Sequence, residues 1–200
     1  NPNDKMWYRR GFKLPDNWSG KDVVIHFEAV DYKCALWVND ILVGTHKGGF
    51  DRFSFNITPY LKSSESQKLV LAVEDATNFS SQPRGKQQIN ASGIYYTPVS
   101  GIWQTVWLEA VSSESYLKQV KTTTDIDKST VSLIPMTNVS LVNRYKVAVN
   151  IFFDGKKVAS GITKPNTPLH LKIENAQLWS PDHPHLYDVK MDLINPSGKV

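Results

Sequence analysis

Hydrophobic and polar residues alternate in short runs along most of the chain, and turn-forming residues separate the runs. Val23, Ile25 and Phe27 fall on one face of an extended segment, because successive side chains of a strand point to opposite sides. Leu36 and Val38 share a face in the next run. Helical periodicity is nearly absent. Short alternating runs at this spacing are typical of all-β sandwiches and barrels, so we expect an all-β protein.

Two hairpin turns stand out between alternating runs. Asn39-Asp40 separates two strand-like segments in the first half of the chain, and Asp154-Gly155 separates two in the second half. These residue pairs suit tight turns that need a positive φ. After residue 115 we count about seven short strand-like segments, a number that favours an immunoglobulin-like sandwich without the usual cysteine pair.

The alternation stops in the segment 76–99, which is rich in Ser, Asn, Gln, Gly and Pro. A loop of this length within a compact domain is uncommon and often functional. Its aromatic and basic residues argue against plain disorder. Alternation resumes at Ile102 and runs through Leu108 with apolar residues on both faces, which predicts one strand packed in a sandwich and facing a second domain.

A short polar segment, Ser-Ser-Glu-Ser at 112–115, interrupts the pattern before it restarts. We therefore expect two domains, 1–112 and 113–200. A length of 200 residues is enough for two ordinary domains.

Composition narrows the class of protein only slightly. The hydrophobic content of 40% and charged content of 21% are those of globular proteins. The net charge is +4, but Lys and Arg are scattered, so we expect no nucleic-acid partner. No apolar run approaches the roughly 18 residues of a membrane span. Cys34, the single cysteine, excludes an internal disulfide and is interpreted as a small buried thiol.

Two further groups of polar residues have types that occur in catalytic or metal sites. Glu74 and Asp75 are adjacent, and adjacent residues on a strand point to opposite faces, so they do not form a catalytic carboxylate pair. The spacing of His183 and His185 suits two metal ligands, but no further His or Cys cluster lies nearby in the sequence. We expect neither a metal site nor a cofactor.

Several motifs, taken in order, resemble glycoside hydrolase family 2, the family of β-galactosidases, β-glucuronidases and β-mannosidases. Each is weak alone, and their ordered combination is specific. They are MWYRRGF, VDYKCALWVN, VGTHKGGF, FNITPYL, QPRGKQ and VSGIWQTVWLE, followed by LWSPDHPHLYDVKMDL near the end. The resemblance implies a jelly-roll (galactose-binding-like) sandwich over 1–112 and an immunoglobulin-like sandwich over 113–200.

The same resemblance implies what lies outside these residues. The family's catalytic (β/α)8 barrel, with its acid/base and nucleophile glutamates, would follow Val200. The first jelly-roll strands usually precede the aromatic-Arg strand, so we expect the first domain to be trimmed at its start. Retaining hydrolysis needs two carboxyls about 5–5.5 Å apart, and no motif in the chain specifies such a pair. We therefore expect no catalytic residue here and no hydrolysis by these residues alone.

In the resembling enzymes the loop before the Ser-Gly-Ile motif reaches the barrel and contributes to the sugar pocket. An aspartate typically stands five residues before that motif, where this chain has Tyr95. Tyrosine rings stack on sugar C–H groups, and basic side chains donate to hydroxyls or to an acidic sugar. The candidate sugar-binding residues are Arg84, Lys86, Tyr95 and Tyr96. For each of them, packing between domains or a surface ion pair is the competing and favoured interpretation.

The leading hypothesis is a non-catalytic N-terminal region of a β-galactosidase-like enzyme, whose partners are its own catalytic barrel and a carbohydrate. β-Glucuronidase and β-mannosidase remain open, as does assembly into homo-oligomers. The alternatives are a free-standing carbohydrate-binding module and a cell-surface protein of immunoglobulin-like domains. We expect a periplasmic or secreted location rather than a cytoplasmic one, although the family occurs in cytoplasm, periplasm and lysosome. The sugar and its linkage are not specified by these residues.

Overall fold

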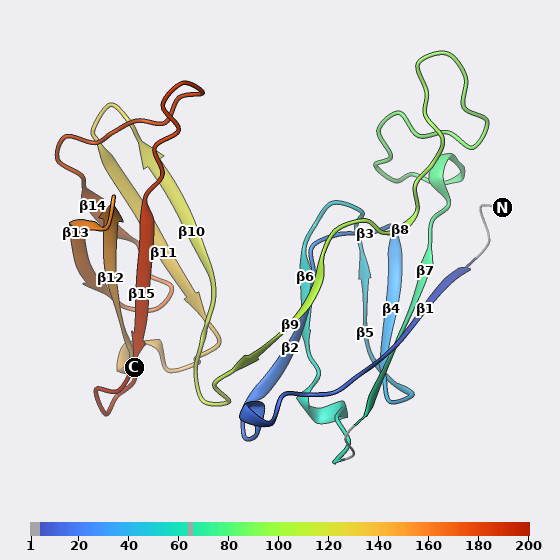
Figure 1. Cartoon of the computed structure of the whole chain (residues 1–200), viewed down its shortest axis with the longest axis horizontal. Coiled ribbons are helices and arrows are strands. Elements are labelled where there is room, and N and C mark those ends of the chain that lie inside the picture. Colours follow the sequence, from blue (N-terminus) through green and yellow to red (C-terminus); the bar gives the residue numbers. More distant parts are fainter. Residues whose placement is uncertain (1–4, 64–65) are drawn as a thin grey trace. The chain divides into compact units, whose positions relative to one another are not determined.

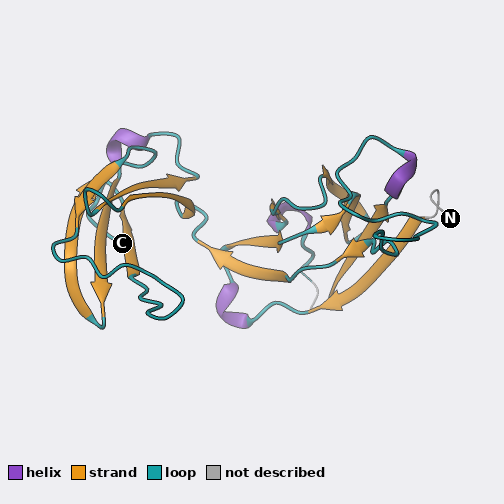
Figure 2. Cartoon of the chain, turned by 90° about the horizontal axis from the view of Figure 1, so that it is seen from above, coloured by secondary structure: helices purple, strands orange, loops and turns teal. Residues whose placement is uncertain are grey.

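A computed structural model describes residues 5–63 and 66–200, and its regular structure is almost entirely strand (Figures 1 and 2). The described helices are four single 3-10 turns: η1 (Asp16–Trp18), η2 (Thr58–Tyr60), η3 (Thr77–Phe79) and η4 (Val142–Arg144). Within the described ranges, no helix has the length and apolarity needed to cross a bilayer. The all-β prediction is confirmed. The chain divides into two compact units, Asn1–Val111 and Ser112–Val200.

The first unit is a two-layer sandwich. One layer has the strand order β1-β7-β4-β5, and its members are β1 (Lys5–Phe12), β4 (Lys33–Val38), β5 (Ile41–Lys47) and β7 (Gln67–Glu74). The other has the order β6-β2-β9, with β2 (Asp22–Phe27), β6 (Phe53–Asn56) and β9 (Val106–Val111). A short pair, β3 (Val30–Asp31) and β8 (Gly101–Ile102), lies at one end. All of these pairings are antiparallel, as in a jelly roll.

The core of the first unit fills the space between its two sheets. Ile25 of β2 and Leu36 of β4 are each 1% exposed, and Leu71 of β7 is 4% exposed. The face predicted from alternation, which includes Val23 and Phe27, belongs to this core. The inward residues come from strands of both sheets that are distant in sequence.

Both predicted hairpin turns are present. β4 and β5 pair antiparallel with Val38 opposite Ile41, and the two linking residues, Asn39 and Asp40, have φ values of 51° and 71°. Two successive positive φ values characterise the turn type that matches strand twist. The Asp154-Gly155 turn has the same property, with φ values of 47° and 72°.

The prediction of a single strand after the loop is wrong in one respect. The segment forms two strands, β8 and β9, instead of one. β8 pairs with β3, placing Ile102 opposite Val30, whereas β9 pairs with β2, placing Val106 opposite Phe27. The chain changes partners between them, and Trp103 turns its indole N–H toward the carbonyl of Gly49 at 2.7 Å. A change of partner depends on distant strands, so local alternation does not reveal it.

The second unit is a sandwich of two three-stranded antiparallel sheets. Their orders are β10-β11-β14 and β13-β12-β15. The strands are β10 (Leu117–Asp125), β11 (Thr130–Thr137), β12 (Lys146–Phe153), β13 (Lys156–Thr163), β14 (Leu169–Lys172) and β15 (Asp188–Ile194). Val131, Leu133, Val147, Val149 and Ile151 form its buried core.

This unit has six strands where the sequence suggested about seven. The segment 173–187 carries no strand, and its Trp179 is 59% exposed. Pro181 and Pro184 contribute to this, because proline has no N–H to donate to a strand ladder.

Because each unit has its own core, we expect Leu36→Ala to destabilise the first unit by about 2–5 kcal/mol, through lost burial and a residual cavity. Urea unfolding followed by tryptophan fluorescence measures this effect, since Trp179 is the only one of the six tryptophans outside residues 1–111. Leu133→Ala is the matched control in the second unit. An equal loss of the fluorescence-detected stability in both variants would contradict separate cores.

Candidate functional site

The segment between β7 and β8, residues 76–99, extends beyond one end of the first sandwich as an irregular loop (Figure 1). Its two arms are held together by backbone hydrogen bonds. Gln88 N donates to the carbonyl of Tyr96 at 3.0 Å, and Tyr96 N donates to the carbonyl of Lys86 at 2.9 Å. The loop therefore has a defined internal pairing although it contains no strand.

This pairing brings three of the four sequence-predicted residues into one neighbourhood. Lys86 and Tyr96 lie on opposite arms, joined by the backbone bond, and Tyr95 adjoins them. Arg84 belongs to the preceding turn, where its carbonyl accepts the N–H of Gln87 at 3.2 Å. The structure thus places Lys86, Tyr95 and Tyr96 together and Arg84 next to them.

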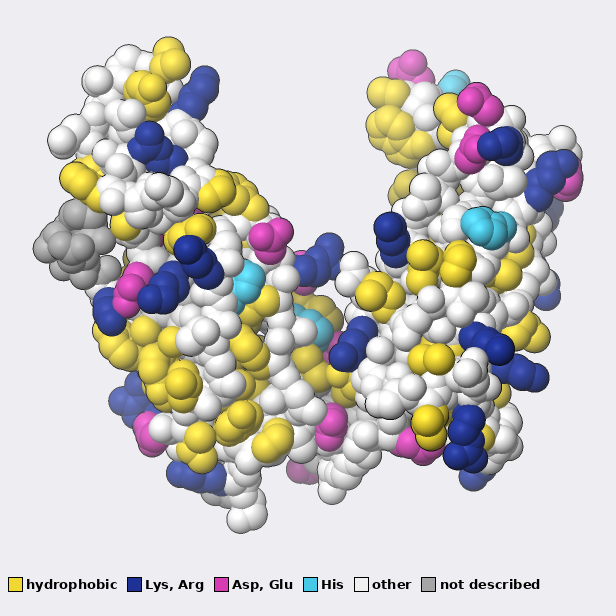
Figure 3. Space-filling model, turned by 180° about the vertical axis from the view of Figure 1, so that it is seen from behind, with side chains coloured by type: hydrophobic (Ala, Val, Ile, Leu, Met, Phe, Trp, Pro, Cys, Tyr) yellow, Lys and Arg dark blue, Asp and Glu magenta, His cyan; other side chains and the backbone are white. Residues whose placement is uncertain are grey.

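These side chains are accessible to a ligand. Tyr96 is 66% exposed and Tyr95 is 41% exposed. Lys86 is exposed and Arg84 is half-buried. Within residues 5–63 and 66–200, no carboxylate lies at ion-pair distance from Arg84. In the space-filling view, hydrophobic and basic side chains adjoin at the projecting part of this unit (Figure 3). Ring faces beside cationic donors suit a polyhydroxylated or acidic ligand.

Two carboxylates lie at the base of the loop. Asp75, directly after β7, accepts hydrogen bonds on Oδ1 from the Thr77 backbone N–H at 2.7 Å and from Gln82 Nε2 at 2.6 Å. Its Oδ2 accepts a hydrogen bond from the hydroxyl of Ser100. The second carboxyl is that of Asp31 in β3, whose pKa is raised by burial and by Asp75 and lowered by the side chain of Gln87.

Asp31 occupies an unusual environment for a carboxyl group. It is 4% exposed, and among the described residues its Oδ1 has no hydrogen-bond partner. The backbone of Gly49 packs so closely that a Cβ there would lie 2.6 Å from Oδ1. Burial, together with the charge of Asp75, raises the pKa of Asp31 to about 6, and the hydrogen bond from Gln87 opposes that rise.

This pair of carboxylates is suited to holding structure and not to attacking a substrate. Asp31 is inaccessible, and both oxygens of Asp75 already accept hydrogen bonds. Glu74 is directed elsewhere, since its carboxylate pairs with Lys5 at 2.7 Å and with Lys33 at 3.8 Å. The proximity of Asp31 and Asp75 is not visible in the sequence, because it arises from contacts between distant strands.

The other titratable candidates belong to other segments of the chain than the loop. Cys34 is 3% exposed, and burial raises the pKa of its thiol to about 11, which suppresses the reactive thiolate. His183 and His185 lie in a turn of the second unit with ring centroids 6.1 Å apart. In the described ranges, no three His, Cys, Asp or Glu side chains converge as a metal site.

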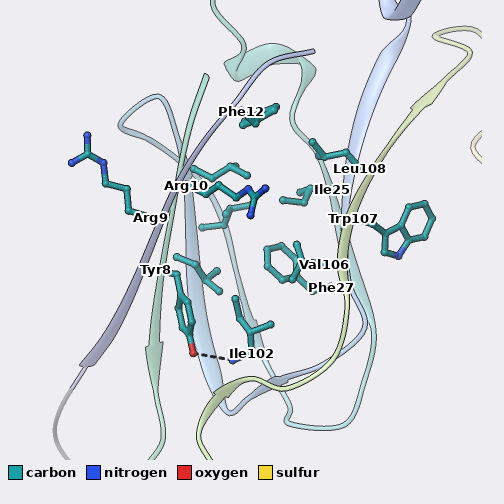
Figure 4. A pocket seen from close by; sticks show the side chains of 13 residues that line it. Tyr8, Arg9, Arg10, Phe12, Ile25, Phe27, Ile102, Val106, Trp107 and Leu108 are labelled. Carbon is teal, nitrogen blue, oxygen red and sulfur yellow. Dashed lines mark hydrogen bonds between the residues drawn. The ribbon is translucent and has the colours of Figure 1, made fainter. Parts of the chain in front are cut away.

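A cleft of about 610 Å³ opens between β1 and β9, the unpaired edges of the two sheets (Figure 4). Tyr8, Phe12, Phe27 and Val106 are among the residues lining it, and Tyr8 Oη accepts a hydrogen bond from Ile102 N at 3.2 Å. Figure 4 shows Arg9 and Trp107 directed away from its centre. The walls are mainly apolar, so the cleft suits an apolar group better than a sugar. No pattern in the sequence predicts this cleft.

The raised pKa of Asp31 has a testable consequence. The carboxyl titrates near 6 in the folded unit and near 3.8 when unfolded, so the folded state binds the proton more tightly. This group's contribution to stability is therefore greatest at low pH and is lost as pH rises from about 4 to about 6. Asparagine cannot ionise. We expect the stability of Asp31→Asn, relative to the unmodified chain, to rise by up to about 3 kcal/mol between pH 4 and pH 7.

Urea unfolding at several pH values, followed by tryptophan fluorescence, measures this difference. Asp16→Asn removes an exposed carboxylate from the same unit and serves as the control. A pH-independent difference between Asp31→Asn and the unmodified chain would contradict the buried-carboxyl account.

The whole chain is similar to curated glycoside hydrolases. The curated β-galactosidase of Thermoanaerobacter pseudethanolicus is 29% identical over 94% of this chain, which covers 26% of that protein. The β-glucuronidase of Paenibacillus borealis is 24% identical over 98% of the chain, which covers 34% of that protein. The chain thus spans about a quarter to a third of the length of these relatives.

A solved structure shows the same fold. The β-glucuronidase from Ruminococcus gnavus in complex with D-glucuronic acid superimposes with a TM-score of 0.77 at 21% identity, over 98% of this chain and 35% of that one. The family description "Glycosyl hydrolases family 2, sugar binding domain" matches residues 1–110, and "Glycosyl hydrolases family 2" matches residues 115–200. With both of its units matched in order, the chain belongs to glycosyl hydrolase family 2.

Proposed function

We propose that this chain is the non-catalytic N-terminal region of a β-galactosidase-like glycoside hydrolase. Its two sandwiches support the enzyme's own catalytic barrel, and the loop 76–99 shapes the rim of the sugar pocket. The observation that carries the proposal is the share of a relative's length that this chain covers. The chain aligns along 94% of its length with a β-galactosidase and covers 26% of that protein. Most of a comparable enzyme is therefore additional to these residues.

The environments of the carboxylates among the described residues are consistent with a non-catalytic role. The carboxylates that approach each other, Asp31 and Asp75, are respectively buried and fully hydrogen-bonded. A retaining glycosidase instead needs an accessible acid and an accessible nucleophile flanking the bond. The general acid and the nucleophile would therefore come from the barrel.

The loop supports the rim assignment. It presents Tyr95 and Tyr96 to solvent, beside Lys86, on a projecting segment with paired arms. Exposed aromatic rings next to hydrogen-bond donors are a common way to orient a sugar. Because Tyr95 stands where the family typically has an aspartate, a ring would replace a carboxylate acceptor at this point of the rim.

Side-by-side assays test the supporting role. We expect the full-length enzyme that contains this region to hydrolyse one of the nitrophenyl β-galactoside, β-glucuronide and β-mannoside substrates, with the galactoside favoured. We expect the 200-residue chain to hydrolyse none. Turnover by the short chain, or its tight binding of a sugar in calorimetry, would instead favour an independent enzyme or a free-standing binding module.

Substitution in the loop tests the rim assignment. In the full-length enzyme, we expect Tyr95→Ala and Tyr96→Ala each to raise KM roughly three- to tenfold, from the loss of one aromatic contact, with a smaller change in kcat. Trp7→Ala removes an aromatic residue that is 61% exposed on β1 and is not part of the loop segment, and is the matched control. Equal KM values for all three variants and the unmodified enzyme would exclude the loop from the sugar site.

A further inference from the structure

The two ends of the loop 76–99 meet at one carboxylate. On one side, Asp75 accepts the backbone N–H of Thr77 at 2.7 Å and Nε2 of Gln82 at 2.6 Å. On the other side, it accepts the hydroxyl of Ser100, which directly precedes β8 and lies 25 positions along the chain from Asp75. A single side chain therefore joins the start of the loop to its end.

A second contact continues the connection into the loop. Oε1 of Gln87, near the middle of the segment, accepts the N–H of Val99 at 2.6 Å. The side chain of Gln87 also acts on the carboxyl group of Asp31, in the body of the sandwich, and lowers its pKa. Gln87 also stands opposite Tyr96 in the isolated bridge between the two arms. The polar network thus runs from the base of the loop to the pairing that carries the candidate residues.

The loop has little apolar burial to replace this network. Phe79 is 65% exposed, Ile94 is 68% exposed and Val99 is 64% exposed. Thr77 has a positive φ of 47°, a strained conformation for a β-branched residue that persists only when neighbouring groups hold it. Hydrogen bonds to a charged acceptor are stronger than neutral ones, so Asp75 is the main restraint at this position.

We propose that Asp75 is a positioning residue: by holding the two ends of the loop together, it fixes the arrangement in which Lys86, Tyr95 and Tyr96 meet the sugar. The sugar part of this inference rests on the proposed function. The holding of the loop does not, and the two parts are tested separately.

Amide hydrogen exchange on the 200-residue chain tests the holding of the loop. In Asp75→Ala we expect the N–H groups of Gln88 and Tyr96, which Asp75 does not contact, to exchange about tenfold faster or more. The core amides of Leu36 and Leu71 are expected to stay protected, which shows that the unit remains folded. Unchanged exchange at both loop amides would overturn the proposal.

Three further variants sharpen this test. Glu74→Gln removes the neighbouring charge, but that side chain pairs with Lys5 and Lys33 and not with the loop, so exchange at the loop amides should not change. Ser100→Ala removes only the partner at the far end of the loop, and we expect a smaller acceleration. The Asp75→Ala/Ser100→Ala double variant should exchange no faster than Asp75→Ala alone. Additive effects, or equal acceleration in Glu74→Gln, would contradict a bond-specific role.

Kinetics of the full-length enzyme test the consequence for the sugar. We expect Asp75→Ala to raise KM at least as much as Tyr96→Ala, with a smaller change in kcat, and Glu74→Gln to leave both constants unchanged. Faster loop exchange with unchanged KM in Asp75→Ala, while Tyr96→Ala raises KM, would overturn the positioning role. Unchanged KM in both variants would instead overturn the rim function and leave Asp75 as a restraint on the loop alone.

Discussion

Burial of the facing sides of two antiparallel sheets is the constraint on which each unit depends. In the first unit, Ile25, Leu36 and Leu71 come from strands far apart in sequence and are all nearly inaccessible to solvent. Hydrophobic burial is non-directional, so it orders the sheets without specifying how the connections at their ends behave. The sandwich can therefore carry a long irregular loop at one end while its core remains unchanged.

The loop is ordered by a different kind of interaction. Its apolar side chains are mostly exposed, and its ends are held by directional hydrogen bonds that converge on Asp75 and Gln87. Hydrogen bonds are electrostatically stronger where water is partly excluded. The burial of Asp31 shows that water is partly excluded at the base of the loop. The cost of that arrangement is one carboxyl group whose proton is retained to a higher pH than usual.

Much of this architecture could be predicted from the sequence, because it follows from local alternation. The inward face of β2, the turn at Asn39-Asp40 and the irregular loop were all visible in the order of residues. The break near Trp103 was not, because it reflects a change of pairing partner. Residue type and family resemblance indicate Lys86, Tyr95 and Tyr96 as candidates. Their pairing across two arms, and the proximity of Asp31 and Asp75, depend on contacts between segments distant in sequence.

The tip of the loop is separate from the buried core, and this separation determines where the sequence can change. The residues that hold the loop stand at its ends and at Gln87, and the buried cluster of the sandwich draws on none of the residues at the tip. Mutations at the tip therefore leave the buried core intact, so the tip can change in sequence where the core cannot. Tyr95 lies in this loop and outside the buried cluster, so an exchange at that position leaves the sandwich core untouched. One scaffold can in this way keep its core while the loop at its end changes.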